Sequence, residues 1–362
     1  MADESPLAAE IRRRIAAAGP MPVHEFMQMS LFHPEYGYYV QRDPFGAGGD
    51  FITAPEISQM FGELIGLWAA EVWRMMGSVA AIALVELGPG RGTLMRDALR
   101  AARVVPQFRQ AASVHLIEAS RGLTERQKDT LREEAGIHWH GALAGVPEMP
   151  AIILANEFFD ALPVHQAVKR ADGWHARTVR LDADARLSFG LAAAPLPEFE
   201  QTLPAAVRDA PLDAVYEWRP DATAHEVARR CLLGGAALVI DYGYSESAAG
   251  ETLQAVQDHR FADPLAAPGH ADLTAHVDFA ALAATAERIG VRTHGPTTQA
   301  AFLRRLGIEA RAARLKSAAA AETAERIDAA TRRLTDEGRT GMGATFKVMA
   351  FSHPSLDRLP GF

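Results

Sequence analysis

A glycine-rich segment carries the strongest chemical signal in the sequence. Residues 86–93 read ELGPGRGT and lie between a predicted strand and a predicted helix. Gly88, Gly90 and Gly92 at alternate positions let the backbone pass close beneath a ligand, where a Cβ atom would clash. The first turn of the helix offers unpaired N–H groups that favour an anionic group. The segment therefore predicts a ligand-binding loop, with a ligand-free structural turn as the alternative.

The residues around these glycines indicate which ligand the loop binds. The dinucleotide pattern GxGxxG requires glycine at position 93, where this chain has Thr93, and no lysine follows as in a phosphate-binding P-loop. The order acid-x-Gly-x-Gly-x-Gly is typical of loops that bind S-adenosylmethionine (SAM). In such a loop Glu86 would face the ammonium group of SAM, and the loop and helix end would face its carboxylate. We therefore predict SAM as the cofactor.

Glu118 stands at the end of the next predicted strand. In doubly wound sheets an acid at this place hydrogen-bonds a ribose diol through its two oxygens, and it repels the 2′-phosphate of NADP. The alternative is an ordinary helix-capping or solvated acid. After the glycine loop, the position favours a cofactor contact.

Residues 156–160 (NEFFD) follow the predicted strand at 150–155. Ligands of such folds bind outside the carboxyl ends of the strands, so these side chains should face the transferred methyl group. The segment partly matches the Asn-Pro-Pro-aromatic motif of amino-group methyltransferases, with Glu157 and Phe158 in place of the prolines. Asn156 is predicted to contact both the cofactor and the methyl acceptor.

The acids of this segment suggest a cationic acceptor. A guanidinium is charged near neutral pH and presents a planar fork of donors. A carboxylate accepts two of these donors side by side. Glu157 and Asp160 are the candidate catalytic acids, and Glu217 is a weaker third candidate. The alternative is structural: Asp160 caps a helix, and Glu157 pairs with a structural arginine.

Histidines add one further candidate. His276 is predicted to accept a proton or contact the substrate, with a structural hydrogen bond as the alternative. His138 and His140 share a strand face, but no acid or cysteine is spaced to complete a metal site, so we predict no metal. No G-x-S-x-G motif is present, which leaves a serine hydrolase without support.

Alternating apolar runs and helical patterns predict an α/β fold with a doubly wound parallel sheet. Near the N-terminus, Thr53 and Glu56 match the S/T-x-x-E capping box, and they predict the start of a long amphipathic helix. The predicted helices include 93–103, 123–134 and 222–233. The predicted strands are residues 81–87, 113–118, 137–140, 150–155, 235–241, 291–294 and 345–351.

The same pattern divides the chain into regions, with an N-terminal helical part and a smaller substrate region inserted into the sheet domain. The expected divisions are 1–80 (helices and a cofactor-covering loop), 81–168 (first half of the SAM-binding core), 169–221 (inserted small α+β region), 222–295 (second half of the core), 296–340 (helical cap) and 341–362 (last strand and tail).

Composition excludes several classes of protein. The chain has 362 residues, a formal charge of −8 and one cysteine. A lone Cys231 excludes an internal disulfide framework and a CxxC zinc site. The acidic balance disfavours a nucleic-acid partner, which needs a basic face. No run of 18 apolar residues occurs, so we predict no membrane insertion, and the N-terminus lacks the apolar core of a secretory signal.

Six blocks in this order give the chain a resemblance to the MidA-like family, whose mitochondrial member is a complex I assembly factor. The blocks are GDFITAPEISQMFGELIG (49–66), VELGPGRGTLMRD (85–97), ANEFFDALPVHQ (155–166), ALVIDYGY (237–244), TLQAVQDH (252–259) and ADLTAHVDF (271–279).

The resemblance implies a class I SAM-dependent methyltransferase with a Rossmann-like seven-stranded sheet. It implies that Glu86, Glu118 and the loop 88–92 hold SAM, that Thr53 closes over it, and that Glu157 and the insertion receive the substrate. The mitochondrial member is a protein arginine methyltransferase that symmetrically dimethylates an arginine of a complex I core subunit. The expected acceptor is accordingly a protein, such as a complex I subunit.

Other readings stay open at this stage. A small-molecule or other N-methyltransferase is the first alternative, and an assembly factor that binds SAM without catalysis is the second. A helical segment at 304–333, rich in alanine and arginine, would face a partner or a second copy in a homodimer. The acidic residues near the N-terminus do not resemble a transit segment, so a bacterial, cytoplasmic protein is expected, whereas the related eukaryotic members act in the mitochondrial matrix.

Overall fold

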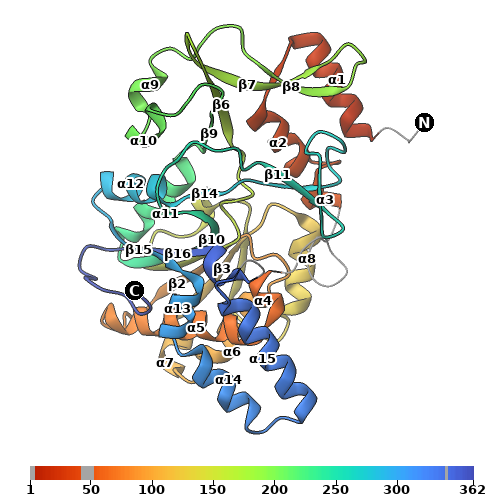
Figure 1. The fold of residues 1–362 in the computed structure, drawn as a ribbon. Helices are drawn as coiled ribbons and strands as arrows, with labels where there is room; N and C mark the ends of the chain where they lie inside the picture. Colours follow the sequence, from red (N-terminus) through yellow and green to blue (C-terminus); the bar gives the residue numbers. More distant parts are fainter. Residues whose placement is uncertain (1–4, 42–52, 339–340) are drawn as a thin grey trace. The chain divides into compact units, whose positions relative to one another are not determined.

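A computed structural model describes residues 5–41, 53–338 and 341–362 of the chain (Figure 1). The described residues form two compact units. The first unit contains residues up to 41 together with Asp160–Pro220 and Glu246–Asp278. The second contains residues 53–159, Asp221–Ser245 and the described part of Phe279–Phe362. No described helix combines the length and the apolar character needed to cross a bilayer.

The second unit is built on an eight-stranded sheet whose main path has the order β15-β16-β10-β5-β2-β3-β4, with β14 beside β10. The five strands from β4 to β10 run parallel, and β16 is antiparallel to both of its neighbours. This confirms the predicted doubly wound, Rossmann-like sheet. The strands are β2 (Ile82–Leu87), β3 (Ala112–Ile117), β4 (Ile137–His140), β5 (Ala151–Asn156), β10 (Gly235–Tyr244), β15 (Arg292–Thr298) and β16 (Phe346–Ser352).

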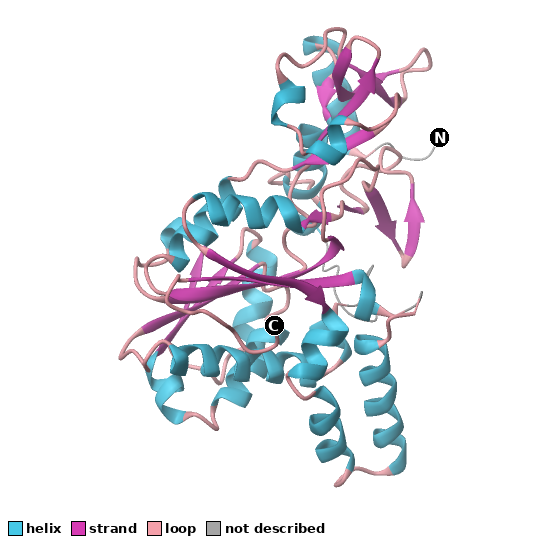
Figure 2. Cartoon of the chain, turned by 60° about the vertical axis from the view of Figure 1, so that its left-hand side comes forward, coloured by secondary structure: helices cyan, strands magenta, loops and turns pink. Residues whose placement is uncertain are grey.

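Helices lie on both faces of this sheet (Figure 2). Several of these helices bury an apolar stripe in the core, as in other layered α/β folds. The helices of the second unit are α4 (Ala54–Ile57), α5 (Gln59–Met75), α6 (Thr93–Ala102), α7 (Pro106–Ala111), α8 (Arg121–Thr130), η1 (Leu143–Gly145), α11 (Ala222–Cys231), α12 (Phe279–Arg288), α13 (Gln299–Arg305), α14 (Ile308–Lys316), α15 (Ala321–Thr335) and α16 (Met342–Thr345).

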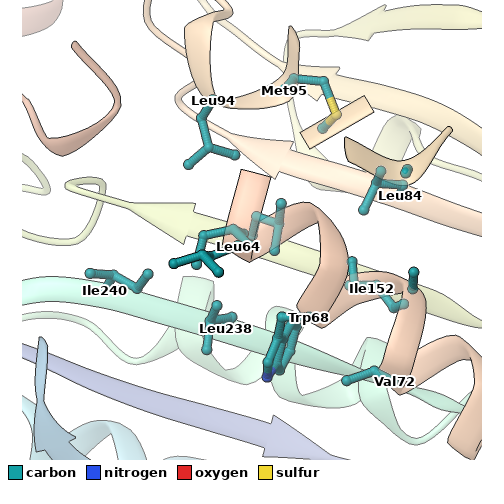
Figure 3. Close-up of a cluster of buried hydrophobic side chains, with 14 of the residues drawn as sticks. Leu64, Trp68, Val72, Leu84, Leu94, Met95, Ile152, Leu238 and Ile240 are labelled. Carbon is teal, nitrogen blue, oxygen red and sulfur yellow. The ribbon is translucent and has the colours of Figure 1, made fainter. Parts of the chain in front are cut away.

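Helix α5 supplies much of the core of the second unit. Leu64, Trp68 and Val72 recur on one face of α5 and are at most 5% exposed. They pack against strand and α6 side chains in one buried cluster (Figure 3). Burying a side chain of this size contributes about 1.5–3 kcal/mol. The buried face of α5 thus packs against the strands that carry the candidate site.

The predicted capping box at Thr53 is wrong. The Thr53 side chain caps nothing, and the helix that follows, α4, ends after one turn at Ile57. Ser58 is extended, and its hydroxyl accepts a hydrogen bond from the Met60 amide to start α5 as a separate helix. The Glu56 carboxylate turns away from its own helix and binds Thr93 instead. A hydrogen bond to a residue distant in sequence therefore replaces the predicted capping hydrogen bond.

The first unit contains a five-stranded antiparallel sheet, β1-β7-β6-β9 with β8 beside β7, and a three-stranded sheet, β12-β11-β13. Its helices are α1 (Pro6–Ala18), α2 (Val23–Phe32), α3 (Tyr38–Gln41), α9 (Phe199–Thr202) and α10 (Ala205–Arg208). Its strands are β1 (Met21–Pro22), β6 (His165–Arg170), β7 (Gly173–Leu181), β8 (Leu187–Leu191), β9 (Val215–Trp218), β11 (Gln254–Gln257), β12 (Arg260–Ala262), β13 (Asp272–Thr274) and β14 (Val277–Asp278).

These units differ from the divisions expected from the sequence. The expected insertion began at residue 169, whereas strand β6 of its sheet already begins at His165. The N-terminal region joins the same sheet, because Met21 pairs with Val179. Residues 246–278 also belong to this unit rather than to the second half of the sheet domain. Pairings between segments so far apart in sequence leave no mark in local hydrophobic patterns.

Candidate functional site

The glycine loop connects β2 to α6, as the sequence predicts. Gly88, Gly90 and Gly92 have φ values of +59°, +53° and +80°, a region that favours glycine. A Cβ atom on Gly88 would also lie 3.0 Å from Cδ2 of Phe158. Gly92 caps α6 with no side-chain hydrogen bond. The loop thus needs its glycines for backbone conformation, and at Gly88 for close packing as well.

Glu86 lies at the carboxyl end of β2, just before this loop. It is 3% exposed, and its Oε2 atom has no hydrogen-bond partner among the described residues. Burial raises its pKa to about 8, against a smaller lowering by the backbone amide of Met95. An unpaired buried oxygen is rare in folded proteins and points to a missing partner. A ligand ammonium group would supply the positive charge and the donors.

Glu118 follows the carboxyl end of β3 and is linked to the glycine loop. Its Oε1 accepts from the Ser120 amide at 2.8 Å, and its Oε2 accepts from Nε2 of Gln127 at 3.0 Å. The same Gln127 nitrogen donates to the carbonyl of Gly90 at 2.8 Å. Burial raises the pKa of Glu118. Gln127 therefore holds the predicted ribose acid and the loop in one network.

A strained turn follows β5 at the same edge of the sheet. Glu157 has φ +51°, a left-handed conformation that costs a residue other than glycine about 1–3 kcal/mol. The fully buried Asp241 of β10 stabilises the turn, because its Oδ2 accepts from the amides of Phe158 (3.2 Å) and Phe159 (2.9 Å). Such strain at the carboxyl end of a strand is a mark of a functional position.

The side chains of this turn join the candidate site. Nδ2 of Asn156 donates to Oε1 of Glu157 at 3.1 Å, and the Ala54 amide donates to the same oxygen at 3.2 Å. The Oδ1 atom of Asn156 is buried without a hydrogen-bond partner among the described residues. Thr53, next to Ala54, is 8% exposed. The second unit thus brings together three predicted site residues, namely Thr53, Asn156 and Glu157.

Asp160 and His276, the other two predicted catalytic residues, belong to the first unit. The Asp160 carboxylate accepts from the Ala161 amide at 2.8 Å. Arg219 brings the two backbones together, because it donates to the carbonyls of Asp160 (2.9 Å) and His276 (2.9 Å). Their catalytic roles stay predictions.

Glu217, the weaker third acid, does not have the role that the sequence suggested. It is 4% exposed, and its carboxylate accepts from Nε2 of Gln166, the amides of Thr252 and Leu253, and the Thr252 hydroxyl. Four donors occupy its oxygens. The residue therefore anchors the 252–253 segment inside the first unit and is not a substrate acid.

Several of these residues escaped the sequence analysis. Gln127, Asp241 and Arg219 act through partners that are distant in sequence. Gln127 has only its place on the inner face of α8 as a signal, and Asp241 only its place at a strand end. Phe158 was read as a replaced proline, whereas its ring packs against Gly88.

The donor and acceptor set fits SAM. Glu86 offers an orphaned buried oxygen for the ammonium, Asn156 offers a second orphaned oxygen, and the loop glycines expose backbone at the start of α6. Acids on both sides of the loop disfavour phosphate-bearing ligands. Among the described residues, no group of three His, Cys, Asp or Glu side chains is placed to hold a metal ion.

Comparisons with known proteins agree with this geometry. Residues 64–297 match the family model described as "Putative S-adenosyl-L-methionine-dependent methyltransferase". The chain is 39% identical to the Drosophila melanogaster protein named protein arginine methyltransferase NDUFAF7 homolog, mitochondrial, over 95% of this chain and 84% of that protein. It is 40% identical to the Homo sapiens protein named protein arginine methyltransferase NDUFAF7, mitochondrial, over 85% and 74%.

A solved structure shows the same fold. A crystal structure from Burkholderia thailandensis, bound to S-adenosyl-homocysteine, superposes with a TM-score of 0.83 at 30% identity, and the match covers 98% of this chain and 93% of that one. These findings confirm the predicted family resemblance, and they confirm SAM as the cofactor of the family. The chain therefore belongs to this family of S-adenosyl-L-methionine-dependent methyltransferases.

Proposed function

We propose that the chain methylates a guanidinium nitrogen of an arginine in a protein. The observation that carries the proposal is the Asn156–Glu157 pair, held at the carboxyl end of β5 by a strained turn whose next residue packs on the glycine loop. The named activity of the Drosophila and human relatives supports arginine as the acceptor.

The cofactor contacts in this proposal come from the second unit. Glu86 binds the ammonium group, Glu118 binds the ribose hydroxyls, and Gly88, Gly90 and Gly92 let the ligand approach the backbone. Thr53 and Asn156 contact the cofactor from α4 and β5. When bound, SAM supplies an electrophilic methyl group.

The acceptor contacts come from Glu157. A carboxylate binds two N–H groups of a guanidinium side by side and leaves the third nitrogen to face the methyl group. Alignment of this kind is the main contribution a protein makes to a direct transfer. The attacked nitrogen would gain the methyl group, with S-adenosyl-homocysteine as the leaving group, and would release one proton to solvent. The arginine then keeps its charge but loses one donor.

The resemblance found in the sequence extends the proposal to the acceptor protein. We include symmetric dimethylation of an arginine in a subunit of respiratory complex I as the specific form of the activity. Such a mark would alter bidentate hydrogen bonding without removing charge, which suits the assembly of a large complex.

The experiment incubates the protein with radiolabelled SAM and a cell extract, followed by protease or nuclease treatment. Label that protease releases as methylarginine supports the proposal. Nuclease-sensitive label, or label only in the small-molecule fraction, makes the chain a different N-methyltransferase. Binding of S-adenosyl-homocysteine without any labelled product makes it a non-catalytic assembly factor.

Glu157→Ala tests the residue assignment. We expect the variant to bind S-adenosyl-homocysteine at most about 20-fold more weakly, because Ala54 loses one hydrogen-bond acceptor. At saturating SAM it should lose methyl transfer by about 100-fold or more, the size of effect that a charged positioning contact has in a transition state. Glu125→Ala, which removes an exposed acid of α8, is the matched control and should transfer methyl groups normally. Normal arginine methylation by Glu157→Ala would remove Glu157 from the proposal.

A further inference from the structure

The one-turn helix α4 is held at both ends by hydrogen bonds to carboxylates of the second unit. At its start, the amide of Ala54 donates to Oε1 of Glu157 at 3.2 Å. Near its end, Oε1 of Glu56 accepts from the hydroxyl of Thr93 at 2.5 Å. Both partners belong to the candidate site, one to the turn after β5 and the other to the start of α6.

Helix α4 is too short to be stable without contacts to the rest of the second unit. It has four residues and no side-chain cap from Thr53, and the extended Ser58 separates it from α5. A single helical turn is unstable alone, because nucleation fixes several residues for one hydrogen bond. Its place is therefore set by tertiary contacts, namely the fully buried Ala54 and the two carboxylate bonds.

Thr93, which donates one of these hydrogen bonds, lies at the junction of the glycine loop and α6. It is the first residue of α6 and directly follows Gly92. Dinucleotide-binding loops have glycine at this place, whereas here a hydroxyl reaches across to Glu56. The carboxylate of Glu56 also stands at the amino end of a ten-residue helix, where the helix dipole stabilises a negative charge.

We propose that Glu56 is a positioning residue of the cofactor site. Its carboxylate ties α4 to the first turn of α6, and this contact fixes Thr53 for its contact with the bound cofactor. The inference rests on the proposed cofactor contacts and goes beyond them, because it assigns a role to the Glu56–Thr93 pair. Loss of either partner should loosen α4 and weaken cofactor binding without unfolding the chain.

The test measures the affinity for S-adenosyl-homocysteine by calorimetry in Glu56→Ala, Thr93→Val and the double variant. Valine matches threonine in shape and lacks only the hydroxyl. We expect each single variant to bind about 5- to 20-fold more weakly, as for the loss of one charge-assisted hydrogen bond. The double variant should bind no more weakly than the worse single variant, because both remove the same interaction.

Two further variants separate positioning from general stability. Thr93→Ser keeps the hydroxyl and should bind almost as the unchanged chain does. Ser58→Ala removes the cap of α5 and should lower the melting temperature while leaving the affinity unaltered. Hydrogen exchange gives an independent readout: bound S-adenosyl-homocysteine should protect the amides of Ala54, Glu56 and Ile57 in the unchanged chain but not in Thr93→Val.

Outcomes against the inference are distinct from those against the cofactor site. Affinities of Glu56→Ala and Thr93→Val within twofold of the unchanged chain, or additive losses in the double variant, overturn the role of Glu56 alone. Failure of the unchanged chain to bind S-adenosyl-homocysteine overturns the proposed cofactor contacts themselves.

Discussion

Two buried polar side chains of the first unit and two of the second differ in how far the chain itself supplies their hydrogen bonds. In the first unit Glu217 and Arg219 are each surrounded by partners, four donors for the carboxylate and four backbone carbonyls for the guanidinium. In the second unit Glu86 and Asn156 each leave a buried oxygen with no hydrogen-bond partner among the described residues. A fully satisfied network makes a rigid scaffold, whereas a buried group left unsatisfied beside the glycine loop can be completed by a ligand.

This difference predicts that mutations of the two kinds of group have different effects. Removing a satisfied charge should damage folding and leave cofactor binding alone. Removing an unsatisfied one should damage binding and can even stabilise the protein, because the apo state carries its desolvation penalty.

Arg219→Ala should give the largest effect on stability. The change removes the guanidinium that donates to the carbonyls of Leu162, Asp160, Ala275 and His276, of which Asp160 keeps one donor, the Ala275 amide. We expect the free energy of unfolding of the first unit to fall by about 3–5 kcal/mol, measured by urea titration. Affinity for S-adenosyl-homocysteine should not change under conditions where the variant is folded.

Arg170→Ala is the control for this prediction, because its guanidinium pairs with Asp213 at the surface of the same unit. It should alter the free energy of unfolding by less than about 1 kcal/mol. Equal destabilisation by both variants would contradict the scaffold role of Arg219.

Gly90→Val should give the largest effect on binding. Valine is strained at φ +53°, and its side chain stands where the backbone must approach the cofactor. We expect affinity for S-adenosyl-homocysteine to fall by at least about 100-fold, which corresponds to about 2.7 kcal/mol. Gly77→Val is the matched control, because Gly77 has φ +85° with no atom near its missing Cβ. Similar affinities for the two variants would mean that Gly90 serves the backbone alone.

Glu86→Gln should give a smaller effect whose size depends on pH. The pKa of Glu86 is about 8 in the folded protein and ordinary when unfolded. Between about pH 4.5 and 8 the folded state therefore binds more protons than the unfolded state, and the residue lowers stability progressively as the pH rises through this window. Glutamine should remove this loss and stabilise the apo protein by about 1–3 kcal/mol at pH 8, with little gain at pH 5.

Thermal melts at the two pH values check this prediction, and calorimetry should show weaker S-adenosyl-homocysteine binding by Glu86→Gln. Affinity of the unchanged chain should also rise with pH through about 8, because the ammonium group favours the ionised carboxylate. A stability gain that is the same at pH 5 and pH 8 would show that Glu86 is not the titrating group.

The sequence predicted the sheet and the glycine loop because both have local causes. Buried strands such as β2 and β5 are continuous apolar runs, and the loop glycines must adopt positive φ. The capping box at Thr53 failed because Thr93, far along the chain, offers Glu56 a better partner than its own helix. Arg219 had no local signal and Gln127 only its place on α8, because their importance comes from the partners that folding brings to them.

The place of β16 in the sheet affects how the chain folds during its synthesis. Residues 346–352 are made after every other strand of the sheet, yet β16 lies between β10 and β15. Until this segment has left the ribosome, the backbone N–H and C=O groups of β10 that face β16 lack the strand that pairs with them. The nascent chain thus passes through a stage that holds the entire glycine loop but an unfinished sheet, with an unpaired strand edge of the kind that promotes aggregation.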